Sequence, residues 1–520
     1  MSKRFNRSLI LLMAFALFVS GAVAVFADKI YPLKTDVTVT WWAPLHANVA
    51  LVAKNLGDTA FAKELQKRTG VKIKFLHPAS GQEREAFNLM LASGDLPDII
   101  EYNWYSIPGG PYSALANGYI MKLNPVFQKY APNLSSFLKK NKDYDKMIKC
   151  DDGSYYVFPF FRADLSLLVT SGPIIREDWL NDLGLKSPTT IDEWYTDLKA
   201  FKDKKGATAP LCVEYSNLSN MFAGGFNNTG GFYVEKDKVK FGGIEANRKE
   251  FFATMNKWYN EGLLDKNFAT ISRKIIDANI LGGKSGATYG SGGSGIGRYM
   301  DANAKDTKYS LIGAAFPGPK KGQVAKFANM SQVYGNSQGS AAISAKCKNV
   351  EAAARLLDYA YGKEGNMLYN FGIEGVSYTM EGNNPKYTEL IMKNPQGMTN
   401  TQVMSLYMRG HTNGPFIQDK RYIEQYYERP QQKAATANWK KNDWEKYIMP
   451  PVTPTADESS ELAKIMGDIT TYSDEMSLKF IMGVEPLSNY DKYVAQIKSM
   501  GIEKAIAIYQ AAYNRYDSRK

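Results

Sequence analysis

The sequence predicts an α/β protein built as two lobes, with a helical C-terminal region. The chain has 520 residues, more than one hydrophobic core usually organises. Short apolar, β-branched runs alternate with amphipathic helical patterns twice along the chain, which favours two α/β sheets. The last third carries helical patterns alone. The contents of 44% hydrophobic and 22% charged residues are those of an ordinary globular protein.

The N-terminal segment is typical of a secretory signal. Basic residues precede an apolar run over residues 9–26, and small residues occupy the first and third positions of the tripeptide 25–27. We expect cleavage after Ala27, so residues 1–27 form the signal peptide. The alternative is an uncleaved membrane anchor, which the polar pair at 28–29 disfavours. No later stretch reaches the about 20 apolar residues that a spanning helix needs.

The chain has three cysteines, Cys150, Cys212 and Cys347. None lies near the cleavage site, so we expect no lipid anchor and a secreted, periplasmic protein. Export permits one disulfide with an odd thiol left over. Three unpaired, partly buried thiols are the favoured alternative. No spacing of histidines or cysteines indicates zinc, and we expect neither a metal nor a cofactor.

The charge of the chain is positive but diffuse. The formal net charge is +12, and the signal contributes three positive charges, so the mature chain carries 12 − 3 = +9. Lysine and arginine are spread along the sequence, which usually indicates a solvated surface. Such an excess mildly favours an anionic ligand. No nucleic-acid-binding motif is present, and we expect no nucleic-acid partner.

The first hundred residues of the mature chain predict a parallel sheet. Strands are expected at 37–40, 71–75 and 98–102, with helices at 60–68 and 83–92. Ligands of such sheets bind beyond the carboxyl ends of the strands. The aromatic residues that follow these expected strands are Trp42, Trp104 and Tyr105.

The middle of the chain predicts further strands and the passages between the lobes. We expect a strand at 165–170, and a return crossing at 332–344 that carries Tyr334 and Asn336. A short strand ending at Tyr289 leads into a glycine-rich stretch. Its nucleotide-binding motifs lack the required partner residues, so a flexible loop near a ligand is the better interpretation.

The C-terminal third predicts long helices. Thr455 and Glu458 form a capping box before an apolar stripe, and a final helix carries aromatic residues on one face up to Tyr516. These stripes indicate core packing.

Three motifs carry a resemblance to a known family. The segment 370–378, Asn-Phe-Gly-Ile-Glu-Gly-Val-Ser-Tyr, follows a helical pattern at 350–369, and its Gly372 and Gly375 predict a tight turn. Together with Ala-Ser-Gly-Asp-Leu-Pro-Asp at 92–98 and the run at 183–194, it resembles the family 1 extracellular solute-binding proteins of sugar ABC importers. Proteins that bind alginate and other polysaccharide fragments are similar.

This resemblance implies a periplasmic-binding-protein fold whose lobes are joined by three crossings, the first of which carries Arg162. Lobe 1 is expected to take 28–162 and 341–372, and lobe 2 to take 163–340 and 373–520. The resemblance implies a monomer that carries an oligosaccharide to an ABC permease and has no enzymatic activity. It places the segment 370–378 at the hinge and cleft, with Glu374 and Tyr378 as site residues.

The family often carries a calcium-binding loop after the run at 183–194. Here the stretch 201–210 has one carboxylate among its lysines. A calcium ion needs six or more oxygen ligands, so we expect the site to be missing.

A sugar site needs aromatic faces surrounded by hydrogen-bonding groups. The candidate ligand-binding residues are Trp42, Trp104, Tyr105, Arg162, Tyr289, Tyr334, Asn336, Glu374 and Tyr378. The fork of Arg162 suits a carboxylate, which favours an acidic oligosaccharide. Two other hypotheses stay open: a secreted glycoside-active enzyme with paired carboxylates, and an exported scaffold or adhesin.

Overall fold

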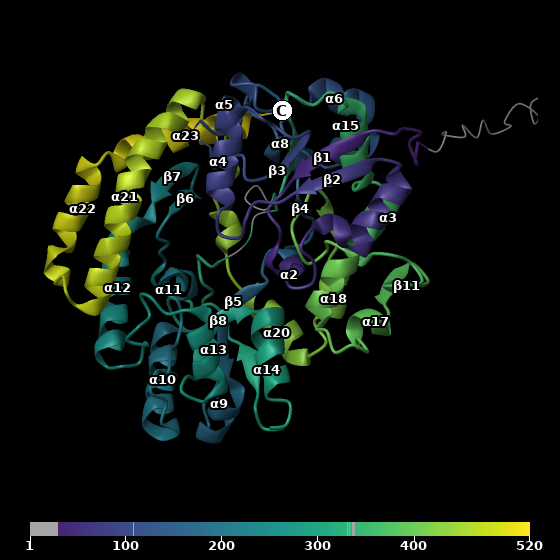
Figure 1. The fold of residues 1–520 in the computed structure, drawn as a ribbon. Helices are drawn as coiled ribbons and strands as arrows, with labels where there is room; N and C mark the ends of the chain where they lie inside the picture. Colours follow the sequence, from purple (N-terminus) through teal and green to yellow (C-terminus); the bar gives the residue numbers. More distant parts are fainter. Residues whose placement is uncertain (1–29, 108, 330, 332, 335–338, 520) are drawn as a thin grey trace, which may run out of the picture.

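Two sheets organise the chain in the computed structural model, which describes residues 30–107, 109–329, 331, 333–334 and 339–519 (Figure 1). One has four strands in the order β10-β3-β1-β2, and the other has three in the order β8-β5-β9. Separate hydrophobic clusters surround the two sheets. The expected two-lobed α/β fold is confirmed.

The first sheet follows from the predicted alternation. β1 (Thr38–Trp42), β2 (Lys72–Leu76) and β3 (Ile99–Glu101) run parallel, and β10 (Ala341–Ile343) joins β3 antiparallel. Helices connect and cover these strands because a parallel sheet needs crossovers over its faces. The helices of this lobe are α2 (Ala47–Ala50), α3 (Ala60–Thr69), α4 (Glu83–Ser93), α5 (Gly110–Ala116), α6 (Asn124–Tyr130), α7 (Pro132–Lys140), α8 (Lys142–Met147), α15 (Val350–Tyr359) and α16 (Lys363–Phe371).

The second sheet is antiparallel. β5 (Ser171–Arg176) pairs with β8 (Ala287–Ser291) and with β9 (Leu311–Gly313). A hairpin of β6 (Phe232–Glu235) and β7 (Lys238–Phe241) lies apart from it. The helices of this lobe are α9 (Glu177–Leu183), α10 (Ile191–Lys205), α11 (Tyr215–Phe222), α12 (Ala246–Asn260), α13 (Arg273–Leu281), α14 (Arg298–Ala302) and α20 (Pro430–Trp439).

The strand expected at 165–170 is wrong. The structure has a short 3-10 helix at Leu165–Leu167, and the strand begins only at Ser171. Asp164 explains the shift, because its side chain accepts hydrogen bonds from the backbone N–H and the hydroxyl of Ser166. This local capping competes with strand formation.

Three segments lie side by side where the chain passes between the lobes. β4 (Phe161–Arg162) pairs in parallel with β13 (Ile417–Gln418), and Phe161 also forms an antiparallel bridge with Tyr334. Three crossings were expected, but the third was placed near Gly372. Because β13 pairs with β4, we propose that the third crossing lies at β13.

The segment after Gly372 stays against the first lobe. It forms β11 (Tyr378–Glu381), β12 (Asn384–Tyr387), α17 (Glu389–Met392) and α18 (Asn400–Tyr407). The helix α19 (Arg421–Tyr426) follows β13. α18 contacts α2 and α3, which differs from the assignment of 373–520 to lobe 2. We therefore propose a boundary at β13.

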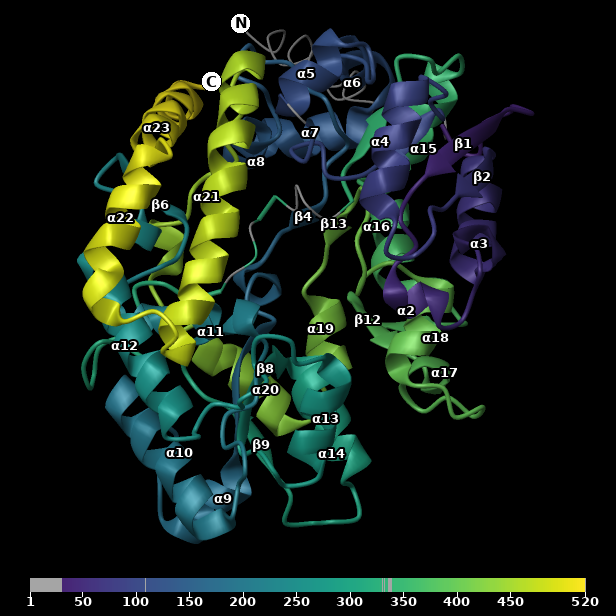
Figure 2. The same cartoon turned by 60° about the vertical axis from the view of Figure 1, so that its left-hand side comes forward.

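The C-terminal helices bridge the lobes. α21 (Ala456–Met482) begins with the predicted capping box of Thr455 and Glu458. It contacts α5 of the first lobe and α12 of the second (Figure 2). α22 (Tyr490–Ser499) and α23 (Ile502–Ser518) pack beside it.

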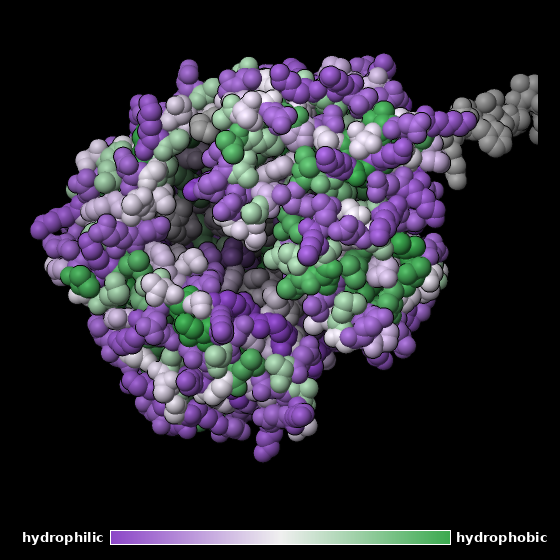
Figure 3. All heavy atoms as spheres, viewed as in Figure 1, coloured by the Kyte–Doolittle hydropathy of each residue, from purple (hydrophilic) through white to green (hydrophobic). Residues whose placement is uncertain are grey.

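The other expectations about the chain as a whole concern cysteines and membrane spans. All three cysteines are unpaired and buried, in line with the favoured alternative. Within the residues that the structure describes, no helix is both long and apolar enough to cross a membrane. On the face drawn in Figure 3 the surface is hollowed near its centre, and hydrophilic residues are visible inside the hollow.

Candidate functional site

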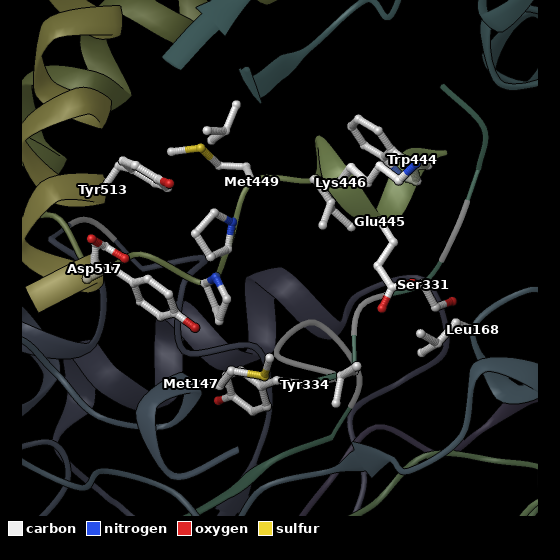
Figure 4. Close-up of a pocket in the computed structure, with 16 residues that line it drawn as sticks. Met147, Leu168, Ser331, Tyr334, Trp444, Glu445, Lys446, Met449, Tyr513 and Asp517 are labelled. Atoms are coloured by element: carbon white, nitrogen blue, oxygen red, sulfur yellow. The ribbon is translucent and has the colours of Figure 1, made fainter. Parts of the chain in front are cut away.

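A pocket of about 360 Å³ is lined by residues from both lobes and from the C-terminal region. Met147 comes from α8 of the first lobe, Val234 from the β6–β7 hairpin, and Tyr334 from the second crossing. Tyr513 lies on α23, and the segment 444–451, which begins with the 3-10 helix Trp444–Lys446, supplies a further wall. We call this cavity the interlobe pocket. Figure 4 shows Met147, Tyr334, Trp444, Met449 and Tyr513 around one common space.

The lining of the interlobe pocket combines aromatic faces with polar groups. Its aromatic residues are Trp444, Tyr334, Tyr513 and Tyr516, and its charged or hydroxyl groups are Glu445, Lys446, Asp517 and Ser331. Figure 4 shows the carboxylates of Glu445 and Asp517 on opposite sides of the space. An apolar pocket with a few placed polar groups is the usual form of a small-molecule site.

A chain of tyrosine hydroxyls lies behind the pocket wall. The hydroxyls of Tyr156 and Tyr334 are 3.0 Å apart, and that of Tyr156 donates to Tyr105 at 3.3 Å. Tyr105 in turn donates to the carbonyl of Pro451 at 3.4 Å. Burial raises the pKa of Tyr334 to about 12 and those of Tyr105 and Tyr156 well above their ordinary value. All three are therefore neutral hydroxyls at pH 7.

Two of the nine predicted site residues are thus brought together. Tyr334 lines the interlobe pocket, and Tyr105 lines a neighbouring cavity of about 340 Å³ between α5 and the start of α21. The link between them is Tyr156, which was not predicted.

The two tryptophans lie in the core of the first lobe. Trp42 is 7% exposed and Trp104 is 1% exposed. Trp42 packs against Phe87 and Tyr102, and Trp104 also packs against Phe87. Neither ring presents a face to the described pockets. Trp42 is buried because β1 extends to residue 42. Its side chain therefore belongs to the covered sheet and not to a loop after the strand.

Arg162 and Tyr289 are also outside the interlobe pocket lining. Arg162 is 8% exposed, its guanidinium lies 4.9 Å from the Phe160 ring centre, and burial lowers its pKa to about 10. Tyr289 is half-buried, and its hydroxyl accepts a hydrogen bond from the Asn329 side chain at 2.6 Å. Burial raises the pKa of Tyr289 to about 12.

The segment 370–378, which carries part of the family resemblance, forms a turn on the first lobe. Gly372 has φ +89° and Gly375 has φ +78°, which confirms the tight turn. Glu374 is exposed, and Tyr378 is buried beside Phe371 in a cluster of its own. Neither lies in a described pocket. Asn336, the remaining candidate, falls outside the described residues.

Sequence reasoning missed the segment 444–451 and assigned Tyr513 and Tyr516 to core packing. The available signal was Trp444-Glu-Lys-Tyr-Ile-Met-Pro-Pro451, an aromatic and apolar run with two prolines between helices. Apolar side chains that gather at the surface outside the long helices and strands are typical of a ligand-binding groove.

A further pocket of about 400 Å³ lies at the carboxyl ends of β1 and β3. Pro44, His46, Tyr102 and Asn103 line it, together with the carboxylate of Glu101. Burial lowers the pKa of His46 to about 4, so this imidazole is neutral at pH 7. Polar residues thus lie just beyond the carboxyl ends of β1 and β3, where ligands of parallel sheets are expected to bind.

Metal ligands are not grouped in the part of the chain that the structure describes: no three His, Cys, Asp or Glu side chains lie together as an ion site. The stretch expected to lack calcium forms the end of α10 and its Gly206 cap. The pockets described above are lined by hydrogen-bonding groups and apolar side chains.

Two α/β lobes, three crossings between them and a pocket lined from both sides define a two-lobed solute-binding protein. The family model for bacterial extracellular solute-binding proteins matches residues 53–367. The chain belongs to this family.

Individual relatives agree with this assignment. The fructooligosaccharide ABC transporter substrate-binding protein FusA of Streptococcus pneumoniae serotype 4 (strain ATCC BAA-334 / TIGR4) is 24% identical over 528 residues, covering 94% of this chain and 92% of the relative. The polygalacturonan/rhamnogalacturonan-binding protein YtcQ of Bacillus subtilis (strain 168) is 24% identical over 470 residues, covering 87% and 88%. The crystal structure of the alginate-binding protein AlgQ2 without calcium ion superposes with a TM-score of 0.76 at 27% identity, covering 94% of this chain and 99% of that one.

Proposed function

We propose that this protein is the extracytoplasmic binding component of an ABC importer and captures an oligosaccharide in the interlobe pocket. The observation that carries the proposal is the lining of this pocket, where aromatic faces from the C-terminal region and the second crossing meet carboxylates and hydroxyls. Sugar rings offer apolar C–H faces and a rim of hydroxyl groups, so this combination suits them. The names of FusA, YtcQ and AlgQ2 support a saccharide ligand.

The same proposal covers the partners and the location. The mature chain acts as a monomer, is released from the membrane after cleavage at Ala27, and delivers its ligand to ABC permease subunits. It performs no reaction on the sugar. Ligand contacts from both lobes are complete only in a closed form, so binding shifts the population toward closure about the three crossings.

The site assignment within the cleft follows the pocket walls. Tyr334, Trp444 and Tyr513 provide the sugar platforms, and Tyr105 supports Tyr334 through Tyr156. An acidic oligosaccharide is favoured by the net charge of the mature chain.

Ligand screening tests the function. The mature protein is scanned by thermal shift against kestose, an alginate trisaccharide and a galacturonate trisaccharide. A ligand at one hundred times its dissociation constant stabilises the folded state by about 2.7 kcal/mol, which is readily measured. Saturable stabilisation by at least one oligosaccharide is the expected result. New reducing ends after incubation would favour the enzyme hypothesis, and absence of any binding would favour a scaffold.

A further inference from the structure

A small polar pocket in the second lobe has no assigned role. Its cavity of about 180 Å³ lies between α11 and the loop that precedes β6. Ser219, Asn220, Asn228 and Thr229 contribute polar side chains, and Phe327 contributes an aromatic one. Every lining residue is uncharged. The volume is below the about 300–1,000 Å³ of sites for drug-sized ligands, so the pocket fits a single ring.

This polar pocket adjoins the interlobe pocket. The Phe327 ring packs edge-on against Trp444, with ring centres 5.4 Å apart. Trp444 lines the interlobe pocket and Phe327 lines the polar pocket. The two cavities are therefore neighbours separated by this pair of rings.

One acceptor in the polar pocket has no partner. Asn228 is fully buried, and its side-chain nitrogen donates to the Gly242 carbonyl and to Asn247. Its Oδ1 has no hydrogen bond to any described residue. A buried acceptor left unpaired is costly, and a ligand hydroxyl would satisfy it.

A buried cation stands directly behind the same pocket. Arg248 of α12 is 7% exposed and donates through Nη1 to the hydroxyl of Ser219 at 2.8 Å. Its Nη2 would lie 3.3 Å from a Cβ atom placed on Gly230, another residue of the wall. The guanidinium also packs on the rings of Phe251 and Phe252.

Within the described chain, Arg248 forms no direct ion pair, and its hydrogen-bond partner is the neutral hydroxyl of Ser219. The carboxylate of Asp474 acts on Arg248 electrostatically, and it accepts a hydrogen bond from Tyr215. A buried charge without a direct counterion favours an anion nearby.

We propose that this pocket takes one terminal ring of the oligosaccharide and that this ring carries a carboxylate. The inference rests on the proposed function. The ring hydroxyls donate to Asn228 Oδ1, and the carboxylate lies against Ser219 and Gly230, within the field of Arg248. Phe327 and Trp444 lie between this pocket and the interlobe pocket.

The test compares a galacturonate trisaccharide with the same trisaccharide after reduction of its carboxyl groups, by calorimetric titration. Wild type should bind the acidic form at least tenfold more tightly. Arg248→Gln should reduce this preference to less than threefold, while Arg248→Lys, which keeps the charge, should retain most of it. Ser219→Ala should weaken the acidic form more than the neutral form.

The matched control is Lys249→Gln, which removes a positive charge one residue further along α12 and should leave the preference unchanged. Thermal unfolding verifies that each variant is folded. If Arg248→Gln does not fold, Ser219→Ala serves as the test variant in its place. Equal affinity for both trisaccharides overturns the inference, as does a preference that disappears in Arg162→Gln but survives both pocket variants. If kestose binds and the acidic trisaccharide has no advantage, only this inference fails. If none of the three sugars binds, the proposed function fails with it.

Discussion

Arg409 and Glu101 form a buried two-point ion pair across 308 positions of sequence. Nη2 and Nη1 of Arg409 donate to the two carboxylate oxygens of Glu101 at 2.7 and 3.0 Å. The side chains are 8% and 3% exposed, and Trp41 Nε1 donates to the same carboxylate at 3.1 Å. The pair therefore fastens the segment after α18 to the end of β3 in the first lobe.

Removal of one partner should be costly. Arg409→Met leaves the Glu101 carboxylate buried with its charge uncompensated, and we expect a loss of about 3–5 kcal/mol in the free energy of unfolding. Denaturant titration measures it. The double variant Arg409→Met with Glu101→Gln should recover at least half of the loss. A loss below 1 kcal/mol in the single variant would contradict the buried pair.

Gly372 should be much less tolerant of a side chain than Gly375. A Cβ at Gly372 would lie 2.4 Å from Ser377 Oγ and 2.9 Å from the Tyr407 carbonyl, whereas one at Gly375 meets nothing within 4 Å. Both have positive φ, which costs a non-glycine residue about 1–2 kcal/mol. We expect Gly372→Ala to destabilise by at least 1 kcal/mol more than Gly375→Ala in chemical denaturation. Equal losses would show that conformation alone matters.

Asp197 should make stability fall as pH rises. It is 3% exposed, its Oδ2 has no partner among the described residues, and burial raises its pKa to about 7. In the unfolded state the pKa of this carboxyl is about 3.9. Between about pH 4 and pH 7 the folded state therefore keeps a proton on Asp197 that the unfolded state has released. Stability from this group is therefore complete below about pH 4 and declines up to about pH 7.

The variant Asp197→Asn isolates this effect. Since one pKa unit corresponds to about 1.4 kcal/mol, we expect the variant to gain at least that much relative to wild type between pH 4 and pH 7.5, measured by urea unfolding. Asp203→Asn, at an exposed position on the same helix, serves as the control and should run parallel to wild type. Parallel curves for both variants would contradict the raised pKa.

Asp151 should hold the C-terminal end of α23 on the first lobe. Its two carboxylate oxygens accept hydrogen bonds from Arg519 Nε and Arg515 Nε at 2.7 Å each. Asp151→Ala leaves both cations without this partner, and we expect a loss of about 1–3 kcal/mol. Hydrogen exchange should accelerate in the last turns of α23. Asp517→Asn, an exposed neighbour, should show no such change.

Trp444 should contribute a sugar platform. We expect Trp444→Ala to weaken binding of the oligosaccharide found by screening at least tenfold, about 1.4 kcal/mol, with the melting temperature of the free protein retained. Tyr472→Ala removes a half-buried ring that stacks on Tyr493 outside the interlobe pocket and should bind as wild type does. Small-angle scattering should show compaction of wild type at saturating ligand. Wild-type affinity in Trp444→Ala would exclude this platform.

Local sequence was sufficient for the elements whose causes are local. The parallel strands β1, β2 and β3, the capping box at Thr455 and the turn at Gly372 each depend on residues within a few positions of one another. The family motifs could be recognised for the same reason, because helix caps and turns have short signatures. The two-lobed fold followed from them.

The site depended on contacts that no local pattern contains. Trp42 and Trp104 stand close to strand ends, but helix α4 covers them through Phe87, so proximity to a strand end did not make them accessible. We propose the third crossing at β13 because residues 417–418 pair with a strand some 250 positions earlier.

The interlobe pocket joins Met147, Tyr334, Trp444 and Tyr513, which are separated by whole lobes in the sequence. Periodicity shows that Tyr513 belongs to a helix face, but not what covers that face. The packing of α23 against both lobes decides that it borders a cavity, since a residue's environment depends on long-range packing that sequence spacing does not encode.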